Sequence, residues 1–227
     1  MAGHQKATGL AEGSGKSLLS ELAEELVWFP AEMSVYSNRW PQLTLVAVIS
    51  AGCVLLYFLD SDLTEFLRYD RGEVAHGQWW RFFSANFLHT NGFHLGLNLV
   101  ALAALTLLMD GVRLGELLTV FCVGAVSVTV GLYLFVPQVY GYVGLSGALH
   151  ALFVLVIRDV FRRDRGLGAL LALVLLIKLG NELWRGPSEA LARLIAADVV
   201  TEAHLFGALG GILGVLITSR LAGRSRA

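Results

Sequence analysis

A few polar side chains in apolar surroundings have the clearest potential for chemistry in this sequence. Ser146 lies between glycines in the stretch GLSG, and His204 occurs in the stretch EAHLFGALGG. A serine hydroxyl and an imidazole can act as nucleophile and general base, because the imidazole takes the serine proton and later returns it to a leaving amine. These residues therefore predict acyl transfer through a covalent serine intermediate, with Ser146 as the nucleophile and His204 as its base.

A second polar pair lies in the stretch HTNGFHLGLN. His94 and Asn98 are four residues apart, so they share one face of a helix. Both side chains can donate hydrogen bonds to a developing oxyanion, a contribution that often dominates acyl-transfer catalysis. A third, acidic residue is not required in principle, because only the nucleophile and the base change covalent state.

Glycines accompany both stretches. Gly144 and Gly147 leave room for a substrate backbone beside Ser146. Gly207 and Gly211 form a face of small residues, which would let their helix approach the helix of Ser146 closely enough for a Ser–His hydrogen bond. Each pattern alone is more typical of close helix packing than of catalysis. The convergence of three distant segments is what favours a functional site.

The composition places these residues in a membrane protein. The chain has 227 residues, of which 56% are hydrophobic and 15% charged, against about 25% charged in a typical soluble domain. Lys, Arg, Asp and Glu are absent from residues 40–59, 82–109, 117–157 and 203–219. A helix needs roughly 20 apolar residues to cross a bilayer. The net charge of −1 gives no sign of nucleic-acid binding.

The sequence predicts an all-α bundle of six transmembrane helices. The uncharged stretch 117–157 is too long for one helix, and Pro137 with the glycines after it divides the stretch. The expected helices cover about residues 43–59, 92–109, 114–135, 146 to the Arg-rich segment RDVFRRDR, 167–184 and 199–219. We expect residues 1–41 to form a polar tail with one candidate amphipathic helix, 42–220 the six-helix domain, and 221–227 a short basic tail.

The distribution of Lys and Arg gives the expected orientation. Cytoplasmic segments of membrane proteins are enriched in these residues, and here the N-terminal tail, the segment 158–165 and the C-terminal end carry most of them. Both termini are then cytoplasmic, and the second, fourth and sixth helices begin at the outer face. All the polar residues named above fall at those helix starts. Ionisable residues at membrane depth are a functional-site hypothesis by default.

Taken together, these motifs resemble the rhomboid family of intramembrane serine proteases. The matching stretches are WWR at residues 79–81, HTNGFHLGLN at 89–98, GLSG at 144–147 and AHLFGALGG at 203–211. The resemblance implies a Ser146–His204 dyad, an oxyanion hole of His94, Asn98 and the Ser146 backbone, and no cofactor or metal. It also implies that His89 supports the loop beside the site, and that Trp80 and Arg81 shape the first outer loop.

Position 150 departs from the family pattern. Many rhomboids carry a tyrosine four residues after the serine, whereas this chain has His150. We expect His150 to contact His204, with a gap-filling role as the alternative. GLSGALH, KLGNELW and EAHLFGALGG resemble the rhombosortase subgroup, which is associated with secreted proteins bearing a GlyGly-CTERM tail. That resemblance implies cleavage of a Gly-rich transmembrane substrate at the outer, periplasmic face of a bacterial inner membrane.

Other interpretations remain at this stage. Lys178 and Glu182, four residues apart, are expected to pair, either as a structural contact or as a docking point for substrate. A metalloprotease would need an HExxH helix, which the sequence lacks, although His94, His150 and His204 are a conceivable zinc set. A general rhomboid protease of other single-span substrates and a non-catalytic rhomboid-like binding protein are the functional alternatives.

Overall fold

The computed structural model of the protein describes residues 39–59 and 61–224. Contacts within the chain divide it into residues 1–40 and 41–227, and the fold below is that of the second unit. The expected amphipathic helix of the N-terminal tail lies outside the described residues.

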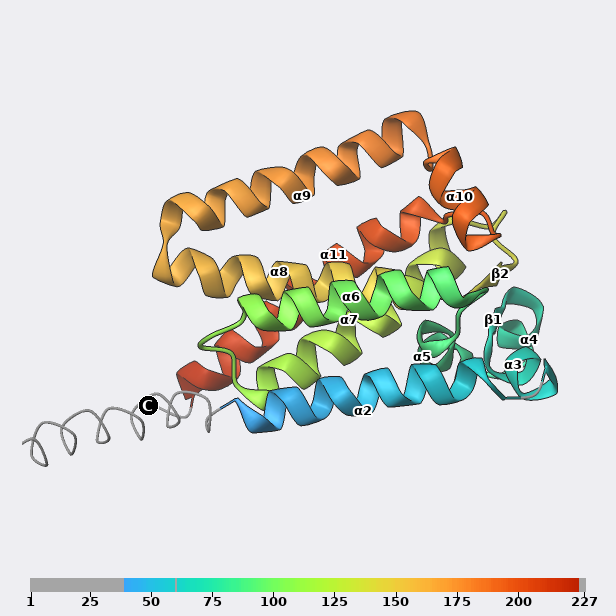
Figure 1. Cartoon of the computed structure of the whole chain (residues 1–227), viewed down its shortest axis with the longest axis horizontal. Coiled ribbons are helices and arrows are strands. Elements are labelled where there is room, and N and C mark those ends of the chain that lie inside the picture. Colours follow the sequence, from blue (N-terminus) through green and yellow to red (C-terminus); the bar gives the residue numbers. More distant parts are fainter. Residues whose placement is uncertain (1–38, 60, 225–227) are drawn as a thin grey trace, which may run out of the picture. The chain divides into compact units, whose positions relative to one another are not determined.

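Six long helices form the framework of this unit (Figure 1). They are α2 (Trp40–Tyr57), α6 (Gly92–Leu108), α7 (Leu114–Phe135), α8 (Ser146–Arg163), α9 (Arg165–Arg185) and α11 (Thr201–Arg224). Each lies within a few residues of an expected helix, except that α11 continues five residues further. The break at Pro137 is present, because α7 ends at Phe135 and α8 begins at Ser146. The all-α prediction is confirmed.

Not all six helices have the composition of a simple membrane span. Among the described residues, α2, α7, α9 and α11 are long and apolar enough to cross a membrane. A fifth candidate is α6 together with the short helices of Arg81–Phe87, which meet it at a bend of 95°. The helix α8 differs because Arg158, Asp159, Arg162 and Arg163 occupy its last two turns. The protein is a multi-pass membrane protein with four to five candidate spans by these measures.

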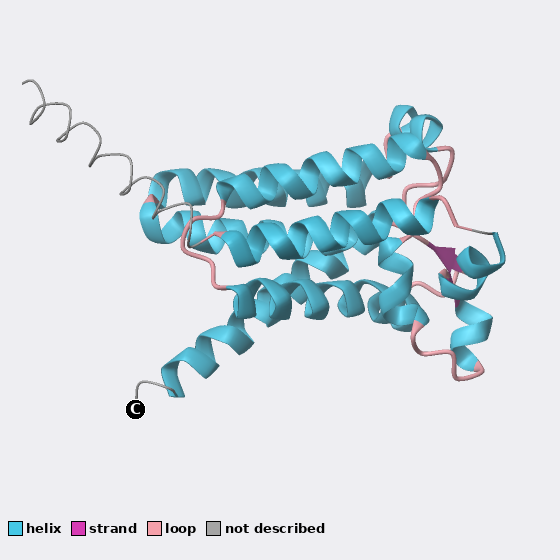
Figure 2. Ribbon diagram, turned by 60° about the horizontal axis from the view of Figure 1, so that its bottom comes forward, coloured by secondary structure: helices cyan, strands magenta, loops and turns pink. Residues whose placement is uncertain are grey.

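The short elements gather at one end of the bundle (Figure 2). They are α3 (Ser61–Leu67), α4 (Arg71–Ala75), α5 (Arg81–Ser84), the 3-10 helix η1 (Ala85–Phe87) and α10 (Glu189–Ile195). The strands β1 (Tyr69–Asp70) and β2 (Gly141–Tyr142) pair antiparallel, with Tyr69 opposite Tyr142. This small ladder ties the loop between α2 and α6 to the loop before Ser146. It was not expected from the sequence, because two-residue strands leave no alternating pattern.

Side chains of the WWRFFS stretch hold the loop between α2 and α6 in place by capping α3. The last carbonyl groups of a helix lack partners within it. The Arg81 guanidinium donates to the carbonyl oxygens of residues 65 and 68, at 2.7 and 2.6 Å. Trp80 Nε1 donates to residue 66 and Ser84 Oγ to residue 67. Arg81 is only 4% exposed, so the expected shaping role of Trp80 and Arg81 has a concrete basis in these hydrogen bonds.

Glycines bring α11 against α8, as the sequence predicted. A Cβ atom at Gly207 would overlap the carbonyl oxygen of Gly147. One at Gly211 would lie 2.7 Å from Cα of Ala151. Real Cβ contacts of this kind do not occur, so only glycine permits this spacing. The predicted small-residue face is therefore confirmed, and it sets the distance between the two helices that carry Ser146 and His204.

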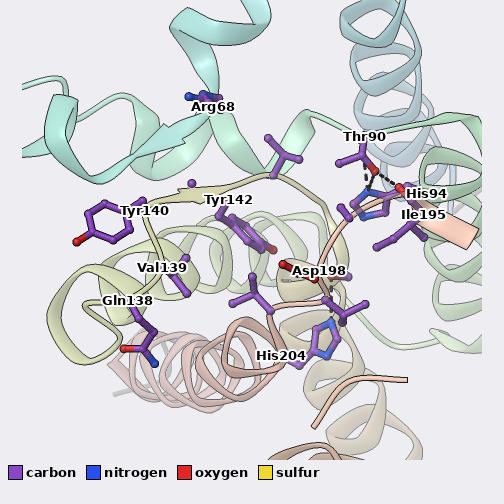
Figure 3. A pocket seen from close by; sticks show the side chains of 16 residues that line it. Arg68, Thr90, His94, Gln138, Val139, Tyr140, Tyr142, Ile195, Asp198 and His204 are labelled. Atoms are coloured by element: carbon purple, nitrogen blue, oxygen red, sulfur yellow. Dashed lines mark hydrogen bonds between the residues drawn. The ribbon is translucent and has the colours of Figure 1, made fainter. Parts of the chain in front are cut away.

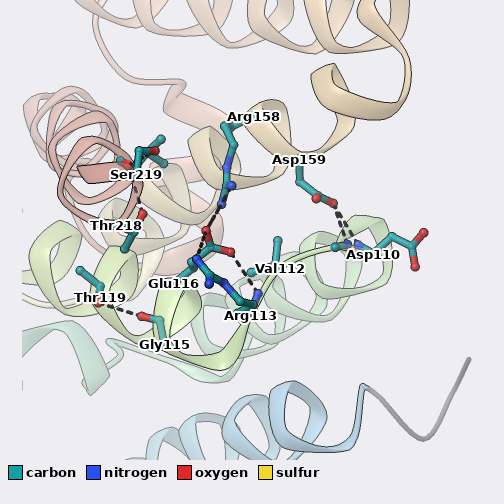
Figure 4. A network of polar contacts seen from close by, with 12 residues as sticks. Asp110, Val112, Arg113, Gly115, Glu116, Thr119, Arg158, Asp159, Thr218 and Ser219 are labelled. Carbon is teal, nitrogen blue, oxygen red and sulfur yellow. Dashed lines mark hydrogen bonds and ion pairs between the residues drawn. The ribbon is translucent and has the colours of Figure 1, made fainter. Parts of the chain in front are cut away.

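Charged residues form hydrogen bonds and ion pairs at the end of the bundle opposite the short elements (Figure 4). The Glu116 carboxylate accepts from the backbone N–H of Arg113 at 3.1 Å and lies 3.3 Å from the Arg158 guanidinium. The Asp159 carboxylate accepts from the backbone N–H of Asp110 at 3.0 Å. These contacts fasten the loop between α6 and α7 to α8, at the end away from the polar cluster described next.

Candidate active site

Ser146 is the first residue of α8. The positive end of the helix dipole surrounds it there, and its own N–H has no partner within the helix. Gly144 shapes the approach to this position, because its φ of +133° is a conformation that side-chain-bearing residues rarely adopt. A Cβ atom there would also lie 2.9 Å from His94 Nε2. Gly144 is thus required both by the backbone turn and by the contact with His94.

His204 lies in the first turns of α11, with its ring directed at Ser146. The distance from His204 Nε2 to Ser146 Oγ is 3.1 Å, which is hydrogen-bonding distance. The imidazole is buried. The structure therefore brings together the serine and histidine that the sequence singled out, in the geometry that a general base needs.

The other ring nitrogen of His204 contacts a carboxylate. His204 Nδ1 lies 2.9 Å from Glu182 Oε2, and Lys178 Nζ donates to Glu182 Oε1 at 2.7 Å. The expected Lys178–Glu182 pair is confirmed. Its contact with His204 was not expected, because helical spacing reveals neighbours within one helix and not those across helices. The available signal was an acid in the C-terminal part of a largely apolar helix.

His150 meets the expectation of a contact with His204. The two rings are stacked, with centroids 4.3 Å apart and an angle of 19° between their planes. The carbonyl oxygen of Ser146 lies 2.7 Å from His150 Nδ1. A carbonyl can only accept, so Nδ1 carries the proton of a neutral ring. His150 therefore covers one face of the His204 imidazole.

His94 lines the same cavity as Ser146. The backbone N–H of Thr90 points to His94 Nδ1 at 3.4 Å, and Thr90 Oγ1 lies 3.1 Å from the same atom. The other ring nitrogen, Nε2, faces Gly144, and it can donate a hydrogen bond in the tautomer that carries its proton there. Asn91 caps α6 by accepting from the His94 N–H at 2.9 Å, which fixes where the helix begins.

Asn98 and His89 lie around His94. The Asn98 side chain donates to the His94 carbonyl oxygen at 3.1 Å, and Asn98 is not one of the residues lining the cavity beside Ser146. The His89 ring packs edge-on against His94, with centroids 5.0 Å apart. The same loop is anchored by Thr90 Oγ1, which donates to the carbonyl oxygen of Ile195 at 2.6 Å. Sequence reasoning missed Thr90, because a lone threonine in a loop gives no signal.

A cavity of about 420 Å³ opens beside Ser146 and His204 (Figure 3). Its walls come from the loop before Ser146, the connection between α10 and α11, and Arg68, Thr90 and His94. Tyr142 is nearly buried in this wall and donates to the Gly144 carbonyl oxygen at 2.9 Å. Burial raises the pKa of the Tyr142 hydroxyl to about 12, so it stays protonated and keeps donating. No motif in the sequence pointed to Tyr142.

The structure groups other residues than the zinc set that the sequence suggested, His94, His150 and His204. Among the described residues, ligand atoms of His150, Glu182 and His204 lie within 4.8 Å of one another, and His94 is not part of this group. The Lys178 ammonium lies 2.7 Å from Glu182 and 3.5 Å from His204 Nδ1. It already supplies positive charge where a metal cation would bind. The cluster is therefore better explained by this ion pair.

Comparison with known proteins gives the class of this chain. A family model described as "Rhomboid domain" matches residues 76–221, well over half of the chain. The Bacillus subtilis (strain 168) protein named "Putative rhomboid protease YdcA" is 26% identical over 187 residues, covering 78% of this chain and 88% of that protein. The chain belongs to the rhomboid family, and its class is that of the rhomboid-type intramembrane serine proteases.

Proposed function

We propose that Ser146 and His204 form the catalytic dyad of an intramembrane endopeptidase that cleaves transmembrane substrates. The observation that carries this proposal is the 3.1 Å contact between His204 Nε2 and Ser146 Oγ, at the edge of a cavity. Ser146 Oγ attacks the scissile carbonyl carbon while His204 Nε2 takes its proton. The same proton then goes to the leaving amine, and water releases the acyl group by the reverse sequence.

The negative charge of the tetrahedral intermediate would be stabilised by two donors. One is the backbone N–H of Ser146 at the start of α8, and the other is Nε2 of His94 in the tautomer that carries its proton on that atom. Asn98 donates one N–H to the His94 carbonyl oxygen, and the second N–H of its amide would be the third donor. Preorganised donors of this kind are worth about 10²–10³ in kcat each.

We also propose how the chain is oriented in the membrane. We place residues 42–220 in a six-span catalytic domain, in which α6 and α8 complete the count. The site then faces the periplasm across a bacterial inner membrane, with both termini in the cytoplasm. The bias of Lys and Arg and the charged network around Glu116, Arg158 and Asp159 at the far end of the bundle support this orientation.

For the substrate, we propose the GlyGly-CTERM tail of secreted proteins, on the resemblance to rhombosortases. A transmembrane helix must unwind before its peptide bonds can be attacked, since its backbone groups are satisfied internally. Glycine lowers helix stability by about 1 kcal/mol relative to alanine, so a Gly-rich segment unwinds more easily. General rhomboid cleavage of other single-span substrates is the second candidate, and a non-catalytic client-binding role is the third.

Cleavage in reconstituted vesicles distinguishes these functions. One substrate carries a GlyGly-CTERM tail and the other an ordinary single transmembrane segment, each with the wild-type enzyme and with Ser146→Ala. We expect cleavage of the first only, lost in Ser146→Ala. Selective cleavage of the second substrate would establish a general rhomboid protease. Undiminished cleavage by Ser146→Ala would refute the nucleophile assignment, and inactivity of folded wild type toward both would favour the binding role.

A further inference from the structure

Glu182 occupies a position that the dyad mechanism leaves without a role. It lies in the last turn of α9, and its carboxylate reaches across to α11, where Oε2 is 2.9 Å from His204 Nδ1. The Glu182 side chain is 16% exposed and that of His204 is 6% exposed. A charged group this well shielded interacts more strongly than one at the surface. The serine, the imidazole and the carboxylate thus lie in one hydrogen-bonded line.

We propose that Glu182 is a positioning residue that completes a Ser146–His204–Glu182 triad. This inference rests on the proposed function and assigns a third member to the same site. Glu182 accepts Nδ1–H of His204, which leaves the lone pair on Nε2 directed at Ser146 Oγ. When Nε2 takes the serine proton, the ring becomes an imidazolium, and the adjacent carboxylate stabilises its charge. Glu182 stays ionised throughout, so only one proton moves, from Ser146 Oγ to His204 Nε2.

Lys178 holds the carboxylate in the orientation that this role needs. Its ammonium binds Oε1 of Glu182 at 2.7 Å, which leaves Oε2 for His204. Lys178 Nζ also lies 3.5 Å from His204 Nδ1. Without the carboxylate, this positive charge would oppose formation of the imidazolium. Glu182 therefore both fixes the tautomer of His204 and neutralises the nearest cation.

His150 restrains the ring from a second direction. Its stacked imidazole and its hydrogen bond to the Ser146 carbonyl oxygen limit tilting of the His204 ring out of its plane. Rotation within that plane is opposed by the contacts of the two ring nitrogens with Ser146 and Glu182. The in-plane direction is the one that decides whether Nε2 faces Ser146, and Glu182 is the partner of the other nitrogen.

A purely structural role for the Glu182–His204 contact is the alternative. Few residues of α9 are buried, namely Gly168, Leu175 and Leu179, so a polar contact near its end could serve to dock α9 on α11. The two roles differ in what they require. Docking needs any hydrogen-bonding side chain of the right length, whereas the triad needs a carboxylate that accepts from Nδ1. A glutamine is isosteric, but its amide NH₂ can donate to Nδ1 and so favour the wrong tautomer.

The test is the rate at which a fluorophosphonate probe labels Ser146 in the purified full-length protein in detergent. Labelling forms a bond from Ser146 Oγ to phosphorus, releases fluoride, and passes the serine proton to His204, so it reports nucleophile activation without a natural substrate. The variants are Glu182→Gln, Glu182→Asp and Lys178→Met. The matched control is Glu189→Gln in α10, where the carboxylate is 88% exposed and pairs with Arg193. Thermal unfolding of each variant identifies any that misfold.

We expect Glu182→Gln to slow labelling about 10²-fold or more, as loss of the acid does in serine-protease triads. Glu182→Asp should recover part of that loss, Lys178→Met should cost about threefold to tenfold, and Glu189→Gln should label like wild type. For a cleavable substrate, Glu182→Gln should lower kcat with KM unchanged. Labelling of folded Glu182→Gln within threefold of wild type, or Glu182→Asp no faster than Glu182→Gln, would overturn the triad. Unchanged labelling of Ser146→Ala would instead refute the proposed function.

Discussion

Substituting Gly207 by alanine should move His204 on α11 away from Ser146 on α8. The added Cβ would overlap the Gly147 carbonyl oxygen and lie 2.6 Å from its carbon, where ordinary carbon contacts are about 3.5–4.0 Å. Backbone faces backbone at this point, so no side chain can rotate away. The helix α11 must therefore retreat from α8 by on the order of 1 Å, given those contact distances.

The retreat of α11 carries His204 away from Ser146. A misplacement of about 1 Å at a catalytic group can cost about 10²-fold in rate. Overpacking of a tight interface also costs about 1–3 kcal/mol of stability. We therefore expect Gly207→Ala to fold with a lower unfolding temperature and to label with the fluorophosphonate probe about 10²-fold more slowly than wild type.

Gly180→Ala is the matched control for this experiment. Gly180 lies inside α9, and an added Cβ would meet nothing within 4 Å. The same substitution there should leave labelling unchanged and stabilise the helix by about 0.4–1 kcal/mol. Wild-type labelling by Gly207→Ala would refute the reasoning, because it would mean that the helix spacing does not set the Ser–His distance.

Two further substitutions test other parts of the structure. Thr90→Val removes the hydroxyl that contacts His94 Nδ1 and anchors the loop to Ile195. Cleavage should slow about fivefold, the rate equivalent of about 1 kcal/mol for one hydrogen bond. Wild-type kinetics would show that the loop is held without this hydroxyl. Asp159→Asn weakens the acceptor of the Asp110 N–H at the far end and should lower the stability by about 1–3 kcal/mol, measured by thermal unfolding. Folded Asp159→Asn should still label at the wild-type rate, and a large loss of labelling would mean that the two ends are coupled.

The sequence predicted the helices well, because a helix that crosses a bilayer must be long and largely free of charged residues. Charge-free stretches and Pro137 located the long helices, and α7 and α8 begin at the residues expected. The small face of Gly207 and Gly211 was predicted as well, because a repeat of four residues along a helix must lie on one side. Such patterns depend on residues that are close together in the sequence, so they can be recognised without knowing how the helices pack.

Contacts between helices were much harder to predict. The pairing of Lys178 with Glu182 followed from their spacing, but the rotation of α9 about its axis, which turns Glu182 toward His204, left no mark in the sequence. Asn98 shares a face with His94, yet its amide binds a carbonyl of its own helix. Tyr142 belongs to the cavity wall only because of a two-residue strand pairing. Each of these depends on how separate segments meet.

The loop between α2 and α6 shows how order can be maintained from within a membrane protein. Burial of apolar side chains contributes, because Tyr69, Val74 and Ala85 belong to a buried hydrophobic cluster. The buried Arg81 guanidinium adds hydrogen bonds to the carbonyl end of α3. Because these donors and acceptors are paired inside the protein, they need no water to satisfy them. The order of this loop therefore has an internal source that is polar as well as apolar.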